Sequence, residues 1–234
     1  FEIYSYRIPK TTSASSSAMA SATEDQVLEH FAGVFTVLDQ GSFRYVLSKN
    51  IDIFVKSLVK YSKLQMLIIP QSFLSNTNVS KLFADILLNY LSNNMEEMQY
   101  PIKHEKGPNA LLLQNLFRLV FGSVTIYPNN EAILRPYVAN IVLSCLKYAS
   151  TVDYPQHYFS VVKSLFRSIG GGKFELLYKE FLPLLPELLN GFMNIHDNGP
   201  EEIRDICVEL CLTVPARLSN LLPFIPILIK VVLN

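Results

Sequence analysis

The chain has 234 residues, half of them apolar, which is enough to form a continuous hydrophobic core. Its 20 lysine and arginine residues balance 20 aspartate and glutamate residues, so it lacks the net positive charge that holds nucleic acid, and we expect no direct nucleic-acid binding. The apolar run at residues 221–229 contains two prolines and is far shorter than the roughly 20 residues that span a bilayer. We therefore expect no membrane-spanning helix and no membrane partner.

Residues 1–23 combine a short aromatic patch with a tract of serine, alanine and threonine. Such a tract has too little bulky apolar surface to offset the entropy of ordering it, so we predict a flexible linker. The first helix is predicted to begin near Thr23, whose hydroxyl can cap it, and to bury Val27, Phe31, Val34 and Leu38. The chain starts without methionine and ends in an apolar pattern without a cap, from which we expect a piece of something longer.

The next part, residues 24–94, is predicted to consist of HEAT-like helices. A short helix through Phe43 and Val46 precedes a longer one at residues 52–61. A segment at residues 64–69 is predicted to end at Pro70, because proline cannot continue the hydrogen-bond ladder. Residues 80–94 follow as an amphipathic helix. We predict a surface loop at residues 95–109, with at most one helical turn at 95–98, because this stretch is polar and contains proline and glycine.

Residues 110–234 show a repeat built on prolines. An apolar-periodic segment ends at Gly170-Gly171-Gly172, and a second one begins at once, which predicts a helical hairpin. In the second arm, Pro183 and Pro186 recur about 40 residues later as Pro223 and Pro226, a spacing within the range of HEAT and armadillo units. We expect each pair to delay or kink its helix, and Pro136 occupies a related place. The predicted fold is an all-α solenoid of HEAT-like helical hairpins.

The candidates for chemistry are few. Gly170 to Lys173 suggests a phosphate nest, but Phe174 stands where a Walker loop has serine or threonine, and a helix precedes the glycines. Cys207 and Cys211 share a helix face and would offer two metal ligands, yet buried apolar cysteine is the favoured interpretation. We predict no enzyme, cofactor, metal or small-molecule substrate. The three cysteines form no CxxC pair, which favours a reducing compartment, cytosol or nucleus.

One charged surface has a distinct pattern. Lys56, Lys60 and Lys63 fall on one helical face, with Lys49 one heptad earlier. We hypothesise that this lysine strip receives an acidic, disordered peptide, because it is locally positive and flanked by apolar residues. The alternative is an ordinary solvated face, which is what charge runs usually form.

Five stretches resemble a known family. They are residues 30–36, LFRLVFGSV at 116–124, LFRSIGGG at 165–172, LYKEFLPLLP at 177–186 and VELCLTVPARL at 208–218. Over about residues 28–234 the chain is similar to TRRAP and its fungal counterpart, the very large pseudokinases of the phosphatidylinositol-kinase-related family. The resemblance implies a piece of the N-terminal HEAT solenoid of a nuclear scaffold.

That family scaffold is shared by histone acetyltransferase complexes such as SAGA, so the implied partners are transcription activators and the other subunits. The family's kinase-like domain lies far C-terminal to this region and lacks catalytic residues, so no family active site falls within it. Two other hypotheses stay open. One is a transport or phosphatase adaptor of the HEAT type, and the other is a small phosphate-binding enzyme that uses the glycine turn.

Overall fold

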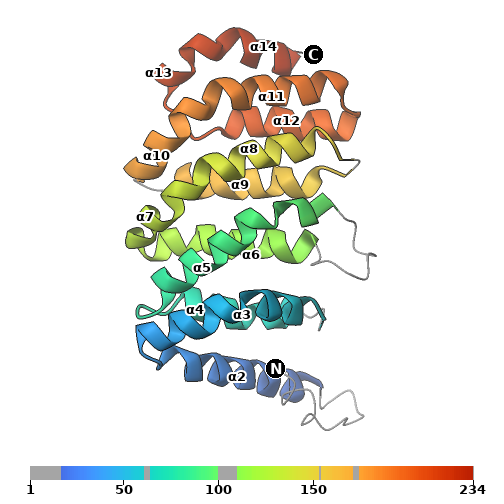
Figure 1. Ribbon diagram of the computed structural model, residues 1–234. Helices are drawn as coiled ribbons and strands as arrows, with labels where there is room; N and C mark the ends of the chain where they lie inside the picture. Colours follow the sequence, from blue (N-terminus) through green and yellow to red (C-terminus); the bar gives the residue numbers. More distant parts are fainter. Residues whose placement is uncertain (1–16, 61–63, 100–109, 153, 171–173, 234) are drawn as a thin grey trace.

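The computed structural model describes residues 17–60, 64–99, 110–152, 154–170 and 174–233, and every regular element in these ranges is helical (Figure 1). The α-helices are α2 (Ser17–Thr36), α3 (Gln40–Lys60), α4 (Ile68–Leu74), α5 (Ser80–Asn93), α6 (Ala110–Ile126), α7 (Glu131–Leu134), α8 (Val138–Ala149), α9 (Gln156–Gly170), α10 (Glu175–Phe181), α11 (Leu185–Asn198), α12 (Glu201–Thr213), α13 (Leu218–Leu221) and α14 (Ile225–Leu233). Short 3-10 helices interrupt or join them: η1 (Leu64–Leu67), η2 (Met95–Gln99), η3 (Pro128–Asn130), η4 (Arg135–Tyr137), η5 (Leu182–Leu184) and η6 (Leu222–Phe224).

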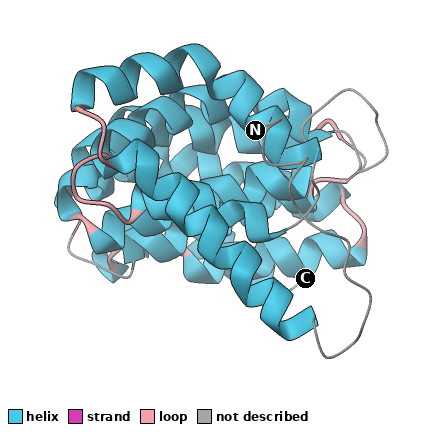
Figure 2. Cartoon of the chain, turned by 90° about the horizontal axis from the view of Figure 1, so that it is seen from below, coloured by secondary structure: helices cyan, strands magenta, loops and turns pink. Residues whose placement is uncertain are grey.

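The helices stack in two rows. In one row α2, α4, α6, α9 and α12 pack against one another in succession, and in the other α3 packs on α5, and α8 on α11, which in turn packs on α14. Figure 2 looks along this stack and shows the connecting loops gathered at the ends of the helices. Each hairpin thus buries the apolar faces of its neighbours, which is the construction of a solenoid. The prediction of an all-α solenoid is confirmed.

The prolines occupy equivalent places in successive layers. The 3-10 segments η4, η5 and η6 contain Pro136, Pro183 and Pro223, respectively. Each segment interrupts a helix in the row that contains α8, α11 and α14. Since proline has no N–H and clashes with the preceding turn, the helix tightens locally instead of continuing as one rod. The interrupted helices stack directly, α10 against α7 and α11 against α8 and α14. The kink predicted at Pro183 and Pro223 is confirmed, and Pro136 shows the same interruption.

The glycine turn itself, residues 171–173, lies outside the described residues. The helices on either side of it meet in the core through aromatic rings. Phe166 of α9 packs edge-on against Phe181 of α10 at 5.4 Å and against Phe192 of α11 at 6.5 Å between ring centroids. Such pairs add about 0.5–1.5 kcal/mol to the burial of the rings. The hairpin predicted around the glycines therefore has a shared apolar core.

Three predicted boundaries are wrong. The first helix starts at Ser17 and not at Thr23, because the alternating alanines of the expected linker are strong helix formers; residues 1–16 lie outside the described part. The break predicted between Val46 and Asp52 does not exist, since α3 runs unbroken from Gln40 to Lys60. Pro70 sits in the first turn of α4, where its missing N–H has no helical partner to lose.

The predicted buried stripe of α2 is also wrong. Leu28 and Ala32 are the buried residues, at 4% and 0% exposure, whereas Val27 and Val34 are 43% and 64% exposed. Helix α2 packs on α4, and the small Ala32 is buried completely. The helix carries two apolar stripes, and sequence periodicity alone cannot say which one faces the stack.

Polar bonds join neighbouring layers. Buried Asn130 donates from Nδ2 to Ser80 Oγ at 2.9 Å, and Ser80 donates to the carbonyl of Leu74 at 2.7 Å. Buried Tyr158 donates to the carbonyl of Met95 at 2.9 Å. Met95 belongs to η2, the helical turn predicted at 95–98, while residues 100–109 of the expected loop lie outside the described part. Bonds of this kind fix the angle at which one layer sits on the next because buried polar groups must be satisfied.

Candidate partner-binding surface

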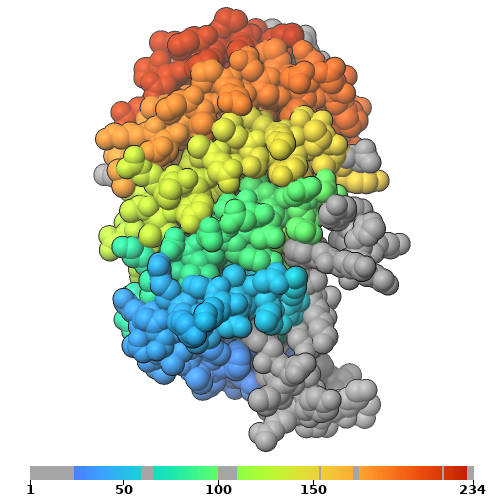
Figure 3. Space-filling model, viewed as in Figure 1, coloured from blue at the N-terminus to red at the C-terminus, as the bar shows by residue number. Residues whose placement is uncertain are grey.

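Lys49, Lys56 and Lys60 of the lysine strip belong to α3, in the first layer, whose surface is in view in Figure 3. Lys56 is exposed and its Nζ forms an ion pair with Asp52 Oδ2 at 2.7 Å, one helical turn away. Lys49 Nζ donates to the hydroxyl of Tyr45 at 2.8 Å. Lys60 is the last residue of α3, and its side chain, like the whole of Lys63, lies outside the described part. The strip is thus placed at Lys49 and Lys56 only, and one of its charges is locally balanced.

An apolar pocket of about 210 Å³ lies beside the strip, between α2, α3 and α4. Its lining residues are Phe31, Phe35, Val46, Leu47, Asn50, Ile53, Phe54 and Phe73. Phe35 packs against Phe31 at 5.2 Å and edge-on against Phe73 at 6.0 Å between ring centroids. The pocket is therefore walled by aromatic rings and aliphatic side chains, with Asn50 as its polar lining residue.

Ile53 connects the pocket with the strip. Positions 49, 53 and 56 are related as i, i+4 and i+7, so Ile53 stands on the same helical face as Lys49 and Lys56. Its side chain is 62% exposed, and it also forms one wall of the pocket. The sequence analysis missed this residue. The available signal was a β-branched aliphatic side chain in the middle of a lysine-rich face.

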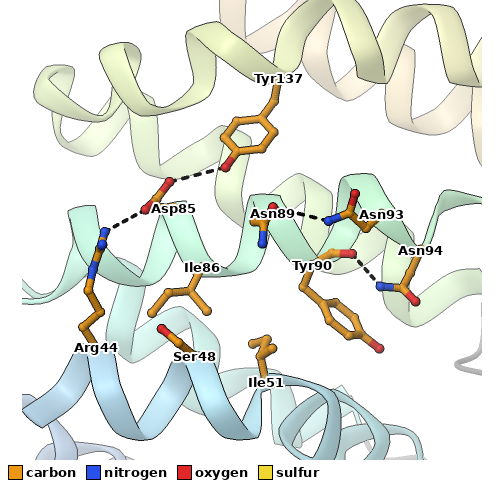
Figure 4. A pocket seen from close by; sticks show the side chains of 10 residues that line it. All are labelled: Arg44, Ser48, Ile51, Asp85, Ile86, Asn89, Tyr90, Asn93, Asn94 and Tyr137. Carbon is orange, nitrogen blue, oxygen red and sulfur yellow. Dashed lines mark hydrogen bonds and ion pairs between the residues drawn. The ribbon is translucent and has the colours of Figure 1, made fainter.

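A second, polar groove of about 320 Å³ lies between α3, α5 and η4 (Figure 4). Arg44 of α3 donates to Asp85 Oδ2 at 2.8 Å, and the hydroxyl of Tyr137 donates to Asp85 Oδ1 at 3.4 Å. Burial and the neighbouring carboxylate of Asp85 raise the pKa of Tyr137. Burial and Asp52 together raise the pKa of Tyr90 to about 12. Both phenols are therefore neutral donors near pH 7.

The asparagines of this groove bond within their own helix. Asn94 donates from Nδ2 to the carbonyl of Tyr90 at 2.8 Å, and Asn93 donates to the side-chain oxygen of Asn89 at 3.3 Å (Figure 4). The Asn94 bond satisfies one carbonyl at the C-terminal end of α5, where the last carbonyls have no helical partner. The polar groove is accordingly a joint between layers, with charges paired inside it.

The pocket next to the glycine turn offers little to a phosphate group. It has a volume of about 280 Å³, and the cationic side chain that lines it is Arg217. Arg217 forms an ion pair with Glu175 at 3.4 Å and lies over the ring of Tyr178, 5.3 Å from its centroid. A phosphate would have to displace this carboxylate. Lys173 and Gly171–172 lie outside the described residues, so the phosphate hypothesis itself stays a prediction.

The cysteines are buried, as the sequence analysis favours. Burial raises the pKa of the thiols of Cys207 and Cys211 to about 12 and raises that of Cys145 as well, so all three are protonated thiols near pH 7. Within the described ranges, His, Cys, Asp and Glu side chains do not gather into a group of three or more that could hold a metal. The helices in these ranges are also too short or too polar to cross a membrane.

The fold and the candidate surface define a class of protein, an α-solenoid of HEAT-like hairpins that presents extended surfaces to partners. The family model described as the Tra1 HEAT repeat central region matches residues 1–234, and the chain belongs to this family. This confirms the resemblance to the family seen in the sequence, but the matching model describes the central region of the HEAT repeats and not the N-terminal part that the resemblance implied.

Similar proteins carry names from transcription. The chain is 42% identical over 230 residues to "Transcription-associated protein 1" of Drosophila melanogaster, covering 97% of this chain and 6% of that protein. It is 44% identical over 208 residues to "Transformation/transcription domain-associated protein" of Homo sapiens, covering 88% and 5%. It is 36% identical over 215 residues to "SAGA complex/NuA4 acetyltransferase complex subunit TRA1" of Saccharomyces cerevisiae, covering 90% and 6%. The chain thus spans a small fraction of these relatives' length.

Proposed function

We propose that this chain is a non-catalytic scaffold segment of a nuclear transcription coactivator, which holds other subunits of a histone acetyltransferase complex and receives the acidic segments of transcription activators. The observation that carries the proposal is the two-row stack of hairpins in a chain of the Tra1 central family, whose yeast relative is named as a subunit of SAGA and NuA4. A solenoid of this kind binds through long surfaces and needs no catalytic centre.

We place the receiving surface for acidic segments at the lysine strip, Lys56, Lys60 and Lys63. Opposite charge steers a flexible peptide to this face and raises its association rate. Since Lys56 is paired with Asp52, an incoming carboxylate has to replace an existing partner, and the net gain per charge is modest.

Two experiments test the two parts of the proposal. For the scaffold, the tagged chain is incubated with nuclear extract and the captured proteins are identified by mass spectrometry, with subunits of an acetyltransferase complex expected. For the strip, all three lysines are changed to glutamate, and binding of a fluorescent acidic activation peptide is measured. The control changes Arg118, Lys147 and Lys179 to glutamate, because all three are exposed and the change in net charge is the same.

The strip variant is expected to lose most of the peptide binding, because its three new carboxylates repel the acidic peptide, and the control is expected to keep it. Equal affinity of the unaltered chain, the strip variant and the control for the peptide would refute the strip as the receiving surface. Capture of nuclear transport factors or phosphatase subunits in place of acetyltransferase subunits would refute the scaffold proposal and favour an adaptor.

A further inference from the structure

We propose that the apolar pocket between α2 and α3 anchors one large apolar side chain of an acidic amphipathic peptide, whose carboxylates lie along the lysines of α3. This inference rests on the proposed receiving function and adds a specific anchor to it. In this proposal the pocket provides most of the binding affinity, and the charges determine the orientation of the bound peptide.

The size and lining of the pocket fit a single side chain. A volume of about 210 Å³ is below the roughly 300–1,000 Å³ of sites for small-molecule ligands, and an apolar cavity of about 150 Å³ already admits a benzene ring. The walls contributed by Phe35, Val46 and Ile53 offer apolar and aromatic contacts. One aromatic or large aliphatic side chain is therefore the occupant that the pocket accommodates.

The apolar surface continues beyond the pocket along α2. Val27 and Val34 are exposed and stand four and three residues from Phe31, so they share that side of the helix. Contiguous exposed apolar surface of this kind marks interaction sites in soluble proteins. A peptide that occupies the pocket can therefore extend a second apolar contact along α2.

The two helices α2 and α3, which line the pocket, carry charges of opposite sign. The α3 side has Lys49 and Lys56, with Asp52 between them, and ends at Lys60. Helix α2 carries the acidic residues Glu24, Asp25 and Glu29, N-terminal to the Phe31 and Phe35 that line the pocket, and the histidine His30. A peptide with carboxylates on one face and apolar residues on the other is attracted toward α3 and repelled from α2. The occupant that matches this asymmetry is an acidic amphipathic helix with its carboxylates toward α3.

The charges alone cannot supply the affinity. Lys56 already has a carboxylate at 2.7 Å, and Lys49 donates to a phenol, so each new ion pair replaces an existing contact. Exposed ion pairs are worth little in any case. Filling the pocket, by contrast, removes apolar surface from water on both sides of the contact.

The test uses the absence of tryptophan from the sequence. A short synthetic peptide of aspartate, glutamate and leucine with one tryptophan then gives a fluorescence signal from the peptide alone. Binding is measured for the unaltered 234-residue chain, for Ile53→Asn, for Lys56→Glu and for the control Leu212→Asn. Ile53 and Leu212 are similarly exposed, at 62% and 67%, and asparagine adds no charge, so the comparison isolates the pocket wall. A second peptide has alanine in place of tryptophan and carries a dye.

We expect a blue shift of the tryptophan emission on binding, about tenfold weaker binding to Ile53→Asn, and unchanged binding to Leu212→Asn. The alanine peptide should bind at least tenfold more weakly than the tryptophan peptide. If Ile53→Asn binds like the unaltered chain while Lys56→Glu binds more weakly, the pocket inference is wrong and the strip proposal stands. Absence of binding to the unaltered chain overturns both.

The competing occupant of this face is a helical hairpin from a second copy of the chain. It is identified by sedimentation velocity of the unaltered chain and of Ile53→Asn. Self-association that is lost in Ile53→Asn, together with no peptide binding, assigns the face to helix stacking and overturns the inference.

Discussion

Glu131 connects two layers of the stack through a bond that a substitution can remove. Its Oε1 accepts the backbone N–H of Leu176 at 2.7 Å and that of Leu177 at 3.2 Å. These are first-turn donors of α10, whose own N-cap residue, Phe174, provides no side-chain acceptor. The carboxylate of the preceding layer therefore caps α10 and sits at the positive end of that helix.

The expected cost of Glu131→Ala follows from this geometry. Bonds to a charged acceptor contribute about 1.5–3 kcal/mol when both partners are buried, and an ordinary N-cap about 1 kcal/mol. Glu131 is only half-buried, and water can reach the freed donors, so we expect about 2 kcal/mol in total. Glu131→Gln keeps an oxygen acceptor and removes the charge, for which we expect about 1 kcal/mol.

Hydrogen exchange measures this effect locally, which matters because a solenoid need not unfold in one step. A loss of about 2 kcal/mol corresponds to roughly 30-fold faster exchange of the amides at the start of α10. Glu187→Ala, in the first turn of α11 and exposed, is the matched control, and it should leave α10 unchanged. Less than threefold acceleration in Glu131→Ala, or equal effects of alanine and glutamine, would refute the capping argument.

Three further predictions concern single side chains. Tyr158→Phe removes the bond to the Met95 carbonyl and should lower the free energy of unfolding in urea by about 1 kcal/mol; an unchanged midpoint would contradict this. Gly199→Ala places a Cβ 2.7 Å from the Ile195 carbonyl oxygen, so we expect a loss of about 1–3 kcal/mol in the same assay, and full stability would show that the backbone can relax there. Burial lowers the pKa of His157 below its ordinary 6.5, so the unfolded chain binds more protons than the folded chain, and the free energy of unfolding should fall as the pH falls through 6.5. The free energy of unfolding of His157→Gln should fall less steeply over the same pH range. Identical pH profiles of the two chains would contradict the role given to His157.

The repeat architecture was predictable because it is written in local chemistry. Proline interrupts a helix wherever it stands beyond the first turn, so its recurrence at Pro183 and Pro223 indicated equivalent layers before any packing was known. Residue spacing alone also placed Pro136 in a related position, and the structure shows the same 3-10 segment there. These features depend on the chain's own backbone and not on its neighbours.

The choice of buried face was not predictable in the same way. Helix α2 has one apolar stripe through Leu28 and Ala32 and another through Val27 and Val34, and both satisfy helical periodicity. Which stripe is buried depends on the approach of α4, a contact between segments far apart in sequence. The larger side chains suggested the wrong stripe.

The candidate surface was predictable in part. The lysine spacing predicts a common helical face, of which the structure describes Lys49 and Lys56, and the pairing of Lys56 with Asp52 follows the i, i+4 rule. The pocket could not be inferred, because its walls come from Phe35, Ile53 and Phe73 on three different helices. Only the relative placement of those helices brings them together.

Ion pairs between segments use part of the cationic charge of this chain, and this limits how the surface can bind. Arg44, Arg135 and Arg217 each pair with a carboxylate of another segment of the chain, so part of the cationic charge serves to join the stack. A partner that exchanges Asp52 for its own carboxylate at Lys56 releases few counterions. Binding to this face should therefore depend on salt much less steeply than binding to a nucleic acid, where each neutralised phosphate adds to the slope. A steep salt dependence of peptide binding would mean that unpaired cations, and not the pocket, provide most of the affinity.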